Sequence, residues 1–320
     1  MQISTKNRRL RIAAVVLAVI FLGCAAGIYA IAASIYDSNF DRRYNTGPAD
    51  TYSIEDFPHL YRSRHTFTSD KEQTLVGYLY SSKILSARKH TVVVFAHGLG
   101  GGGQRGYMDI FDRLAAQGYD IFAYDATAND ESEGKAVGGL PQGVIDLSHA
   151  LDYISTLEGL QEHAIVLMGY SWGAYSVANV LNDHPDVAAV AMLSGFNRST
   201  DLIEDRGRKI ASDAVGLLMP FAFIHEYRLF GRYAFFTAMK GFDNSSCRVM
   251  VVHGDRDTTV PIRYGLEAFK EKYGENERFT FKRYPGRDHC IIENSVGWRD
   301  MELIDEIARF FDTAVSEKQK

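Results

Sequence analysis

The sequence predicts an α/β fold in which a mostly parallel β-sheet is flanked by helices, with a helical cap insertion and an N-terminal transmembrane helix. Short, continuously apolar segments alternate with amphipathic segments from about residue 91 onward, which is typical of parallel strands buried on both faces. The alternation fails at about residues 196–246. In addition, the first forty residues contain an uncharged run long enough to cross a bilayer.

The composition is that of an ordinary globular protein. The 320 residues are 46% hydrophobic and 23% charged, which is enough material for one large core. The net charge is -5, and beyond the N-terminus no basic run exceeds two residues. Nucleic-acid binding requires a basic surface, so we exclude nucleic acid as a partner.

Residues 1–36 are predicted to form a transmembrane anchor. Residues 12–36 carry no charge and would span about 36 Å as a helix. More basic residues precede this run than follow it closely, so the positive-inside rule predicts a cytoplasmic N-terminus and an extracytoplasmic domain. The basic residues are Lys6, Arg8, Arg9 and Arg11 before the run, and Arg42 and Arg43 after it.

Two alternatives for the N-terminus remain open, a cleaved signal peptide and a lipoprotein signal in which "FLGC" presents Cys24 for acylation. Both are weakened because the apolar run continues for twelve residues beyond Cys24. The other two cysteines, Cys247 and Cys290, are expected near opposite ends of one sheet, roughly 20 Å apart and too far for a disulfide.

Residues 37–64 are predicted to be a linker with at most one short helix, followed by a folded domain over residues 65–318. The segments "HTFTS" and "TLVGYLY" alternate well enough to predict a hairpin. The following elements are then expected in order: strand "TVVVFAH", helix 104–117, strand "YDIFAYD", helix 141–157, strand "AIVLMGY", helix 172–182, strand "VAAVAMLS", the aromatic-rich cap at about 196–246, strand "CRVMVVHGD", helix 262–272, strand "RFTFKRY" and helix 296–315.

The stretch "GYSWG" places Ser171 between two glycines, directly after a predicted buried strand and before a helix. A sharp strand-to-helix turn strains its corner residue and needs small neighbours two positions before and after it, which Gly169 and Gly173 supply. The free amides of the helix N-terminus favour a developing negative charge there. The pattern predicts a nucleophilic serine, while a helix N-cap is the alternative interpretation.

A nucleophilic serine needs a histidine and an orienting carboxylate. "HGDRDTTVP" follows one predicted strand and places Asp257 at its end, and "YPGRDHC" follows the next and places His289 there. Asp255 and Asp288 are rivals for the carboxylate role. The sequence therefore predicts a catalytic triad of Ser171, His289 and Asp257.

From about residue 65 to residue 315 the chain resembles the alpha/beta-hydrolase superfamily, in particular its serine aminopeptidase S33-like, monoglyceride-lipase-like branch. The motifs are "HGLGG" at 97–101, "GYSWG" at 169–173, "HGDRDTTVP" at 253–261 and "GRDH" at 286–289, and the order Ser, Asp, His matches. The resemblance implies that the amides of Leu99, with Gly100 as neighbour, and Trp172 form the oxyanion hole. It also favours Asp257 as the acid.

Three histidines and one loop near the expected site also have predicted roles. His97 is expected to brace its loop and His253 to be structural, while His225 in the cap is a candidate for substrate contact, although a core or exposed histidine is the favoured interpretation. Where relatives carry a glycine-rich loop after the fourth strand, this chain reads "DATANDESEG" and keeps only Asp125, Ser132 and Gly134.

The expected activity is hydrolysis of a small-molecule or lipid-like carboxylic ester through an acyl-enzyme, with neither cofactor nor metal. An aminopeptidase or amidase is the first alternative, and Glu204, Asp205 and Glu226 in the cap could hold a free amino terminus. A membrane-anchored binding protein without catalytic activity is the second.

Overall fold

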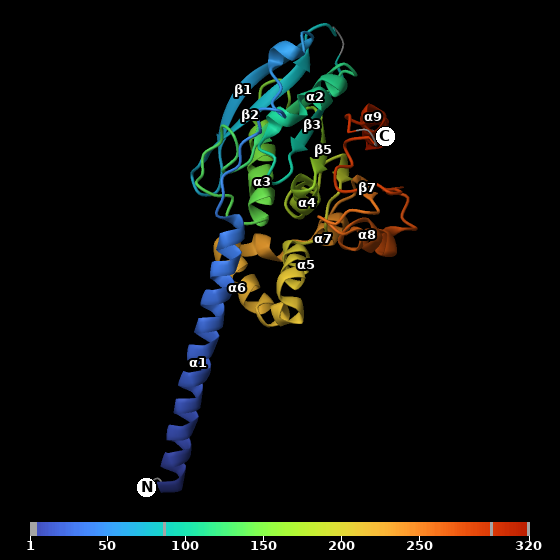
Figure 1. Cartoon of the computed structure of the whole chain (residues 1–320). Coiled ribbons are helices and arrows are strands. Elements are labelled where there is room, and N and C mark those ends of the chain that lie inside the picture. Colours follow the sequence, from blue (N-terminus) through green and yellow to red (C-terminus); the bar gives the residue numbers. More distant parts are fainter. Residues whose placement is uncertain (1–4, 86–87, 295–296, 319–320) are drawn as a thin grey trace.

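The computed structural model describes residues 5–85, 88–294 and 297–318, and its centre is one eight-stranded sheet (Figure 1). The strand order is β1-β2-β4-β3-β5-β6-β7-β8. All neighbours from β4 to β8 are parallel, while β2 is antiparallel to both β1 and β4. The strands are β1 (Leu60–Thr68), β2 (Thr74–Ser82), β3 (Thr91–Ala96), β4 (Asp120–Asp125), β5 (Ala164–Tyr170), β6 (Ala189–Leu193), β7 (Arg248–Gly254) and β8 (Phe279–Tyr284). The mostly parallel sheet and the hairpin are confirmed.

Helices cover both faces of the sheet because the central strands are apolar on both sides. In β3, Val92 and Val94 pack into one core cluster while Val93 and Phe95 pack into the other. The helices α3 (Pro141–Ser155), α4 (Trp172–Asn179) and α8 (Leu266–Tyr273) belong to the first cluster, and α2 (Met108–Ala115) and α9 (Met301–Lys318) to the second. Short 3-10 helices extend three of the predicted helices: η2 (Gln104–Tyr107), η3 (Val180–Asn182) and η6 (Ile262–Tyr264).

Two predicted boundaries were wrong. The hairpin strand β1 begins at Leu60, inside the predicted linker, and Leu60 is fully buried against the sheet. The last helix begins at Met301 rather than near 296, which itself lies outside the described residues. Asp300 accepts a hydrogen bond from the amide of Leu303, so it caps the helix and fixes its start.

Between β6 and β7 the chain forms a run of helices, where the sequence predicted the cap. They are α5 (Ser199–Ala211), η4 (Ser212–Leu217), α6 (Met219–Phe230), η5 (Gly231–Phe235) and α7 (Ala238–Asn244). The last of these belongs with the sheet, because Ala238 and Phe242 are fully buried in the core cluster that includes α4. We call residues 199–235 the cap.

The N-terminal segment forms one long helix, α1 (Thr5–Phe40), which projects from the domain beside α6 (Figure 1). Its stretch Arg8–Phe40 is long and apolar enough to cross a membrane. The helix continues four residues past its predicted end, because Tyr36 and Phe40 are buried against the rest of the protein. The short linker helix is η1 (Ile54–Asp56), and all three cysteines are free thiols.

Candidate active site

Ser171 lies at the corner between β5 and α4. Its backbone has φ 56° and ψ −114°, a region that side chains rarely adopt. A Cβ atom at Gly169 would lie 2.3 Å from the carbonyl oxygen of Gly173, and one at Gly173 would lie 1.9 Å from that of Ala96. Both positions of the motif therefore admit only glycine, because the turn brings backbone against backbone.

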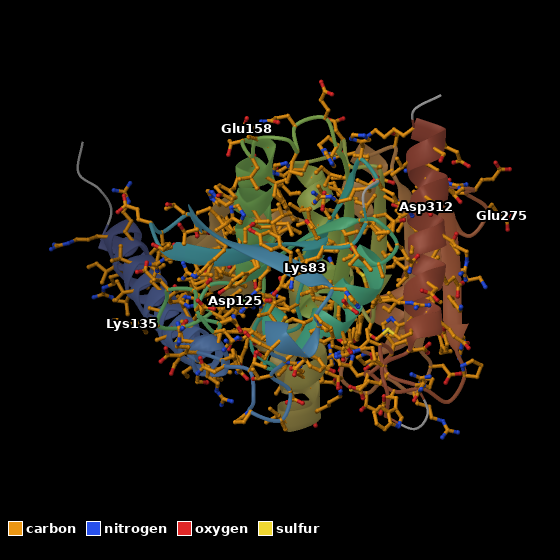
Figure 2. The ribbon with its side chains drawn as sticks, turned by 90° about the horizontal axis from the view of Figure 1, so that it is seen from above. Lys83, Asp125, Lys135, Glu158, Glu275 and Asp312 are labelled. Carbon is orange, nitrogen blue, oxygen red and sulfur yellow. The ribbon has the colours of Figure 1, made fainter. Side chains whose placement is uncertain are left out.

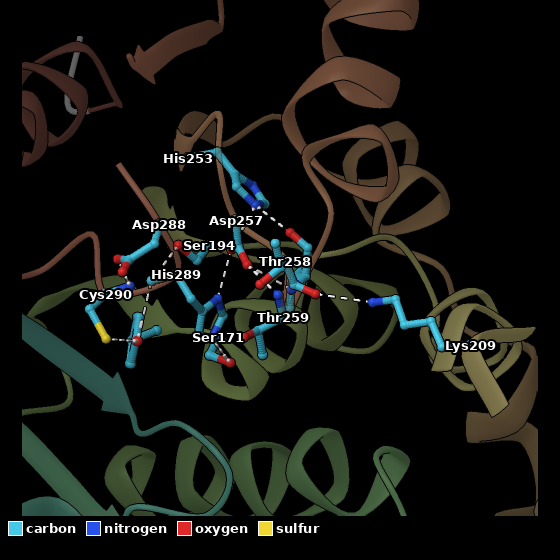
Figure 3. Close-up of polar contacts among 12 residues, drawn as sticks. Ser171, Ser194, Lys209, His253, Asp257, Thr258, Thr259, Asp288, His289 and Cys290 are labelled. Carbon is cyan, nitrogen blue, oxygen red and sulfur yellow. Dashed lines mark hydrogen bonds and ion pairs between the residues drawn. The ribbon is translucent and has the colours of Figure 1, made fainter. Parts of the chain in front are cut away.

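The structure brings Ser171, His289 and Asp257 together (Figure 3). His289 Nε2 lies 2.8 Å from Ser171 Oγ, and His289 Nδ1 lies 2.7 Å from Asp257 Oδ2. The three residues come from the loops that follow β5, β7 and β8, whose carboxyl ends meet at one edge of the sheet. Since an ionised carboxylate only accepts hydrogen bonds, Nδ1 of the neutral ring carries the proton and Nε2 is free to accept the serine proton.

Asp257 is held by four hydrogen bonds. Its Oδ1 accepts the amides of Thr259 at 2.9 Å and Val260 at 2.8 Å, and its Oδ2 accepts from His289 and from His253 Nε2 at 3.2 Å. Although burial opposes its ionisation, the hydrogen bonds from His253 and His289 and the amide of Val260 hold the pKa of Asp257 below its ordinary value. The carboxylate is therefore ionised and fixed in orientation.

The two rival carboxylates are engaged elsewhere. Asp255 accepts the amide of Gly286 at 2.7 Å and pairs with Arg283 at 3.4 Å. Asp288 accepts the amide of Cys290 at 3.0 Å. Neither is hydrogen-bonded to the imidazole of His289, so Asp257 is the carboxylate that the geometry selects.

The two expected oxyanion donors, the amides of Leu99 and Trp172, belong to segments next to Ser171: a Cβ atom on Gly98 would lie 3.6 Å from Ser171 Cβ, and Trp172 directly follows the serine. Leu99 lies in the loop after β3 and is half-buried, and Trp172 is the first residue of α4. Within the described ranges, neither amide donates a hydrogen bond to another residue. The indole of Trp172 donates to the carbonyl of Leu140 at 2.8 Å, which fixes the residue after Ser171.

His97 braces the loop that carries Leu99, as the sequence predicted. Its Nε2 accepts the amide of Ala126 at 3.0 Å, so its Nδ1 carries the proton and donates to the carbonyl of Gly98 at 2.9 Å. Burial lowers the pKa of His97, which keeps the ring neutral in this arrangement. The structural interpretation of His253 is also supported: it is fully buried, and its Nε2 donates to the carbonyl of Val260 at 2.9 Å.

Two residues that the sequence reasoning missed hold the backbone of His289. Ser194 Oγ donates to the carbonyl of His289 at 3.0 Å, and Tyr170 OH donates to the same oxygen at 3.3 Å. Ser194 has φ 54°, a second strained position at a strand end. Their position at the carboxyl ends of β6 and β5 is the signal that could have pointed to them.

The three residues of the loop after β4 that match the resembled family's pattern organise that loop. Asp125, which Figure 2 shows within the body of the molecule, accepts the amide of Gln104 at 2.8 Å. Its carbonyl accepts from Ser132 Oγ, which in turn accepts the amide of Val76. Burial raises the pKa of Asp125 to about 7. Gly134 has φ 116°, so the loop keeps a glycine where the backbone requires one.

The cap carboxylates do not form one cluster. Glu204 pairs with Arg208, Asp205 pairs with Lys209 and Arg263, and Glu226 accepts hydroxyl hydrogen bonds from Tyr36 and Ser199.

His225 of the cap lies between Tyr29 and Asp37 of α1, at 3.0 Å and 2.7 Å, rather than near Ser171. The cap reaches the site through α5, where Lys209 donates to the carbonyl of Thr258 beside Asp257 (Figure 3).

Comparison with known proteins agrees with this architecture. The sequence profile of the alpha/beta hydrolase fold family matches residues 91–214. An esterase from Pyrococcus furiosus superposes with a TM-score of 0.64 at 16% identity, covering 85% of this chain and 98% of that chain. The protein has the alpha/beta-hydrolase fold. Est1E from Butyrivibrio proteoclasticus, solved with ferulic acid bound, superposes with a TM-score of 0.58 at 18% identity, covering 79% of this chain and 99% of that chain.

Part of this alpha/beta-hydrolase-fold protein is similar in sequence to a protein from Mycobacterium phage D29 named "Putative non-heme haloperoxidase". The two are 32% identical over 103 residues, which is 32% of this chain. The match spans about a third of the phage protein's length, 34%. Among the described residues, no group of three His, Cys, Asp or Glu side chains could hold a metal ion.

Proposed function

We propose that the protein is a membrane-anchored serine hydrolase that cleaves carboxylic esters, of the S33-like, monoglyceride-lipase-like branch of the fold. The observation that carries the proposal is the hydrogen-bonded chain from Ser171 through His289 to Asp257, with two unengaged amides beside the serine. A serine hydroxyl, a base and an orienting carboxylate in that order are what acyl transfer requires.

In this mechanism Ser171 Oγ attacks the ester carbonyl while its proton passes to His289 Nε2. Asp257 holds the ring in the required tautomer and stabilises the imidazolium. The amides of Leu99 and Trp172 bind the oxyanion, and one such donor is typically worth about 3 kcal/mol. The imidazolium then protonates the leaving alcohol, and a water, deprotonated by His289, releases the acid from the acyl-enzyme and restores Ser171.

We further propose that α1 crosses a membrane with its N-terminus in the cytoplasm and the hydrolase domain outside. The excess of basic residues before the apolar run supports that orientation. The cap lies beside α1 (Figure 1), which would put it close to the bilayer surface. A cap at the bilayer surface supports a small-molecule or lipid-like ester with an apolar acyl group as the substrate.

The alternatives are less well supported. A peptidase that holds a free amino terminus needs unpaired carboxylates, whereas Asp205 is paired with Lys209 and Arg263, and Glu226 is enclosed by hydroxyl groups. A binding protein without catalytic activity would have no use for the strained backbone at Ser171, since a residue in such a region costs on the order of 1–3 kcal/mol.

A fluorophosphonate probe tests the nucleophile directly. The wild-type protein should be labelled and Ser171→Ala should not be, while Ser155→Ala, at an exposed serine at the end of α3, should be labelled like wild type. Equal labelling of Ser171→Ala would refute the assignment. A parallel screen of p-nitrophenyl esters of graded chain length against aminoacyl-nitroanilides separates an esterase from a peptidase, and turnover of neither would indicate a binding protein.

A further inference from the structure

A cavity of about 110 Å³ lies between α1 and the cap. Its walls are almost entirely apolar, and they come from α1, α5, η4 and α6, with Leu140 at the inner side. The lining side chains include Ala32, Ile35, Leu140, Arg206, Ile210 and Ala222. None of these residues belongs to the proposed triad or the oxyanion hole.

The outer side of the cavity faces the region where a bilayer would end. A bilayer's hydrocarbon core takes about 20 helical residues, so counting from Ile12 places its far edge near Ile31. The α1 wall of the cavity begins at Ala32, one residue further. Ile35 is 49% exposed and Ile210 is 89% exposed, so the cavity is bordered by apolar surface that continues from α1 onto the cap.

One unpaired charge stands at this rim. Arg206 lines the cavity from α5 and is exposed, and within the described part of the chain it makes no ion pair or hydrogen bond. Its neighbours Asp205 and Arg208 are both paired, with Lys209 and Glu204 respectively. A guanidinium with five free donors beside an apolar cavity is suited to a phosphate group attached to an acyl chain.

Two of the residues that line the cavity, Tyr36 and Leu140, are hydrogen-bonded to side chains behind its wall. Tyr36 OH donates to Glu226 at 2.7 Å, and Ser199 donates to the other oxygen of Glu226 at 2.5 Å. Leu140, on the wall, accepts the indole hydrogen bond of Trp172. An acyl chain in the cavity would therefore lie one residue away from the indole that follows Ser171.

We propose that this cavity binds one acyl chain of an anionic phospholipid from the bilayer, with the phosphate at Arg206. The inference rests on the membrane anchoring proposed above and goes beyond it, because it assigns a lipid site to the junction of α1 and the cap. Bound lipid would hold the cap at the membrane surface, next to the site where an ester substrate is cleaved.

The two tryptophans of the chain make a direct test possible. The full-length protein is reconstituted in the Ser171→Ala background, so that no lipid is consumed, into phosphatidylglycerol–phosphatidylcholine vesicles whose phosphatidylglycerol chains are either plain or brominated near their middle. Bromine quenches tryptophan at short range, and the single intervening residue Leu140 leaves Trp172 close enough to a chain in the cavity to be quenched. With Trp298→Phe added, Trp172 is the sole emitter, and its fluorescence should fall in brominated vesicles. With Trp172→Phe instead, exposed Trp298 should emit equally in both.

Two variants sharpen the assignment. Ala222→Phe fills the cavity and should abolish the quenching of Trp172, whereas Ala234→Phe, at a cap alanine with similar exposure (7% against 8%) outside the cavity, should preserve it. A second set of vesicles carries the bromine on phosphatidylcholine instead, and the protein without a change at Arg206 should be quenched more strongly by brominated phosphatidylglycerol than by brominated phosphatidylcholine. Arg206→Gln should abolish this difference, and a difference that persists in the variant would overturn the phosphate site at Arg206.

Unquenched Trp172 in protein that floats with the vesicles would overturn the lipid site alone, as would undiminished quenching in Ala222→Phe. Protein that does not float with vesicles would overturn both the anchor and the lipid site. Failure of the hydrolase proposal is read separately, from probe labelling of Ser171 in the wild-type protein.

Discussion

Replacing Asp257 by asparagine should disable the site while leaving its shape nearly unchanged. The amides of Thr259 and Val260 both point at Oδ1 and cannot turn away, so an asparagine must place its carbonyl oxygen there. Its NH₂ group then faces the nitrogen atoms of His253 and His289 that now donate to Oδ2. The substitution therefore offers a donor where the imidazole of His289 needs an acceptor.

The consequence is a change of tautomer. His289 Nδ1 must accept the new N–H, so the ring proton moves to Nε2, which then donates to Ser171 Oγ and cannot take its proton. In serine hydrolases with this geometry the same substitution costs about 10⁴-fold in rate. At about 1.36 kcal/mol per factor of ten, that equals roughly 5.4 kcal/mol of transition-state stabilisation.

The measurement is kcat/KM for a p-nitrophenyl ester together with the rate of fluorophosphonate labelling, both on full-length protein in detergent. Asp255→Asn is the matched control, because Asp255 lies two residues away and binds Gly286 and Arg283 instead of the imidazole. The control should keep nearly full activity. A loss of less than about tenfold in Asp257→Asn, or an equal loss in both variants, would refute the proposed role of the carboxylate.

Two further predictions concern stability. Gly173→Ala should lower Tm by several degrees in a thermal melt, because the added Cβ would lie 1.9 Å from a backbone oxygen. Overpacking of this kind costs about 1–3 kcal/mol. The control Gly101→Ala has open space around the added Cβ and should melt like wild type. Burial raises the pKa of Glu226, so the folded state holds its proton more tightly than the unfolded chain. The stability due to Glu226 is thus complete below about pH 4.5 and is lost as pH rises, and Glu226→Gln should gain in Tm over wild type between pH 5 and pH 8. A gain that shrinks as pH rises would contradict this.

The sheet and the serine corner could be predicted from the sequence because the signals for both are local. A run such as "TVVVFA" is apolar on both faces of a strand and is therefore expected to be buried on both. The two glycines of "GYSWG" indicate a backbone turn that leaves no room for a Cβ atom at either position. The loops that carry Asp257 and His289 could be located because parallel strands end at the same edge of the sheet, and the family resemblance favoured Asp257 over the neighbouring Asp255. Each of these predictions needed a few consecutive residues and a general rule.

The predictions that were wrong depended on contacts between distant segments. Nothing near residue 36 indicates that α1 continues to Phe40, because the burial of that residue comes from other parts of the chain. Likewise Glu226 has the sequence appearance of a surface carboxylate, yet it is fully buried by partners 27 and 190 positions away. Burial that is created by tertiary packing has no periodicity that a short window of sequence could display.

The contacts between α1 and the cap also bear on how the N-terminus is processed. Tyr29, Tyr36 and Asp37 all bind α6, through His225 or Glu226. A signal peptide cleaved beyond Asp37 would remove the hydrogen bonds of His225 to Tyr29 and Asp37 and that of Glu226 to Tyr36, and one such hydrogen bond typically contributes about 0.5–1.5 kcal/mol to stability. Acylation at Cys24 would keep every one of these contacts. The packing therefore favours mature forms that retain α1 from Tyr29 onward, so that the C-terminal part of α1 is a structural part of the cap in addition to the anchoring role proposed for the helix.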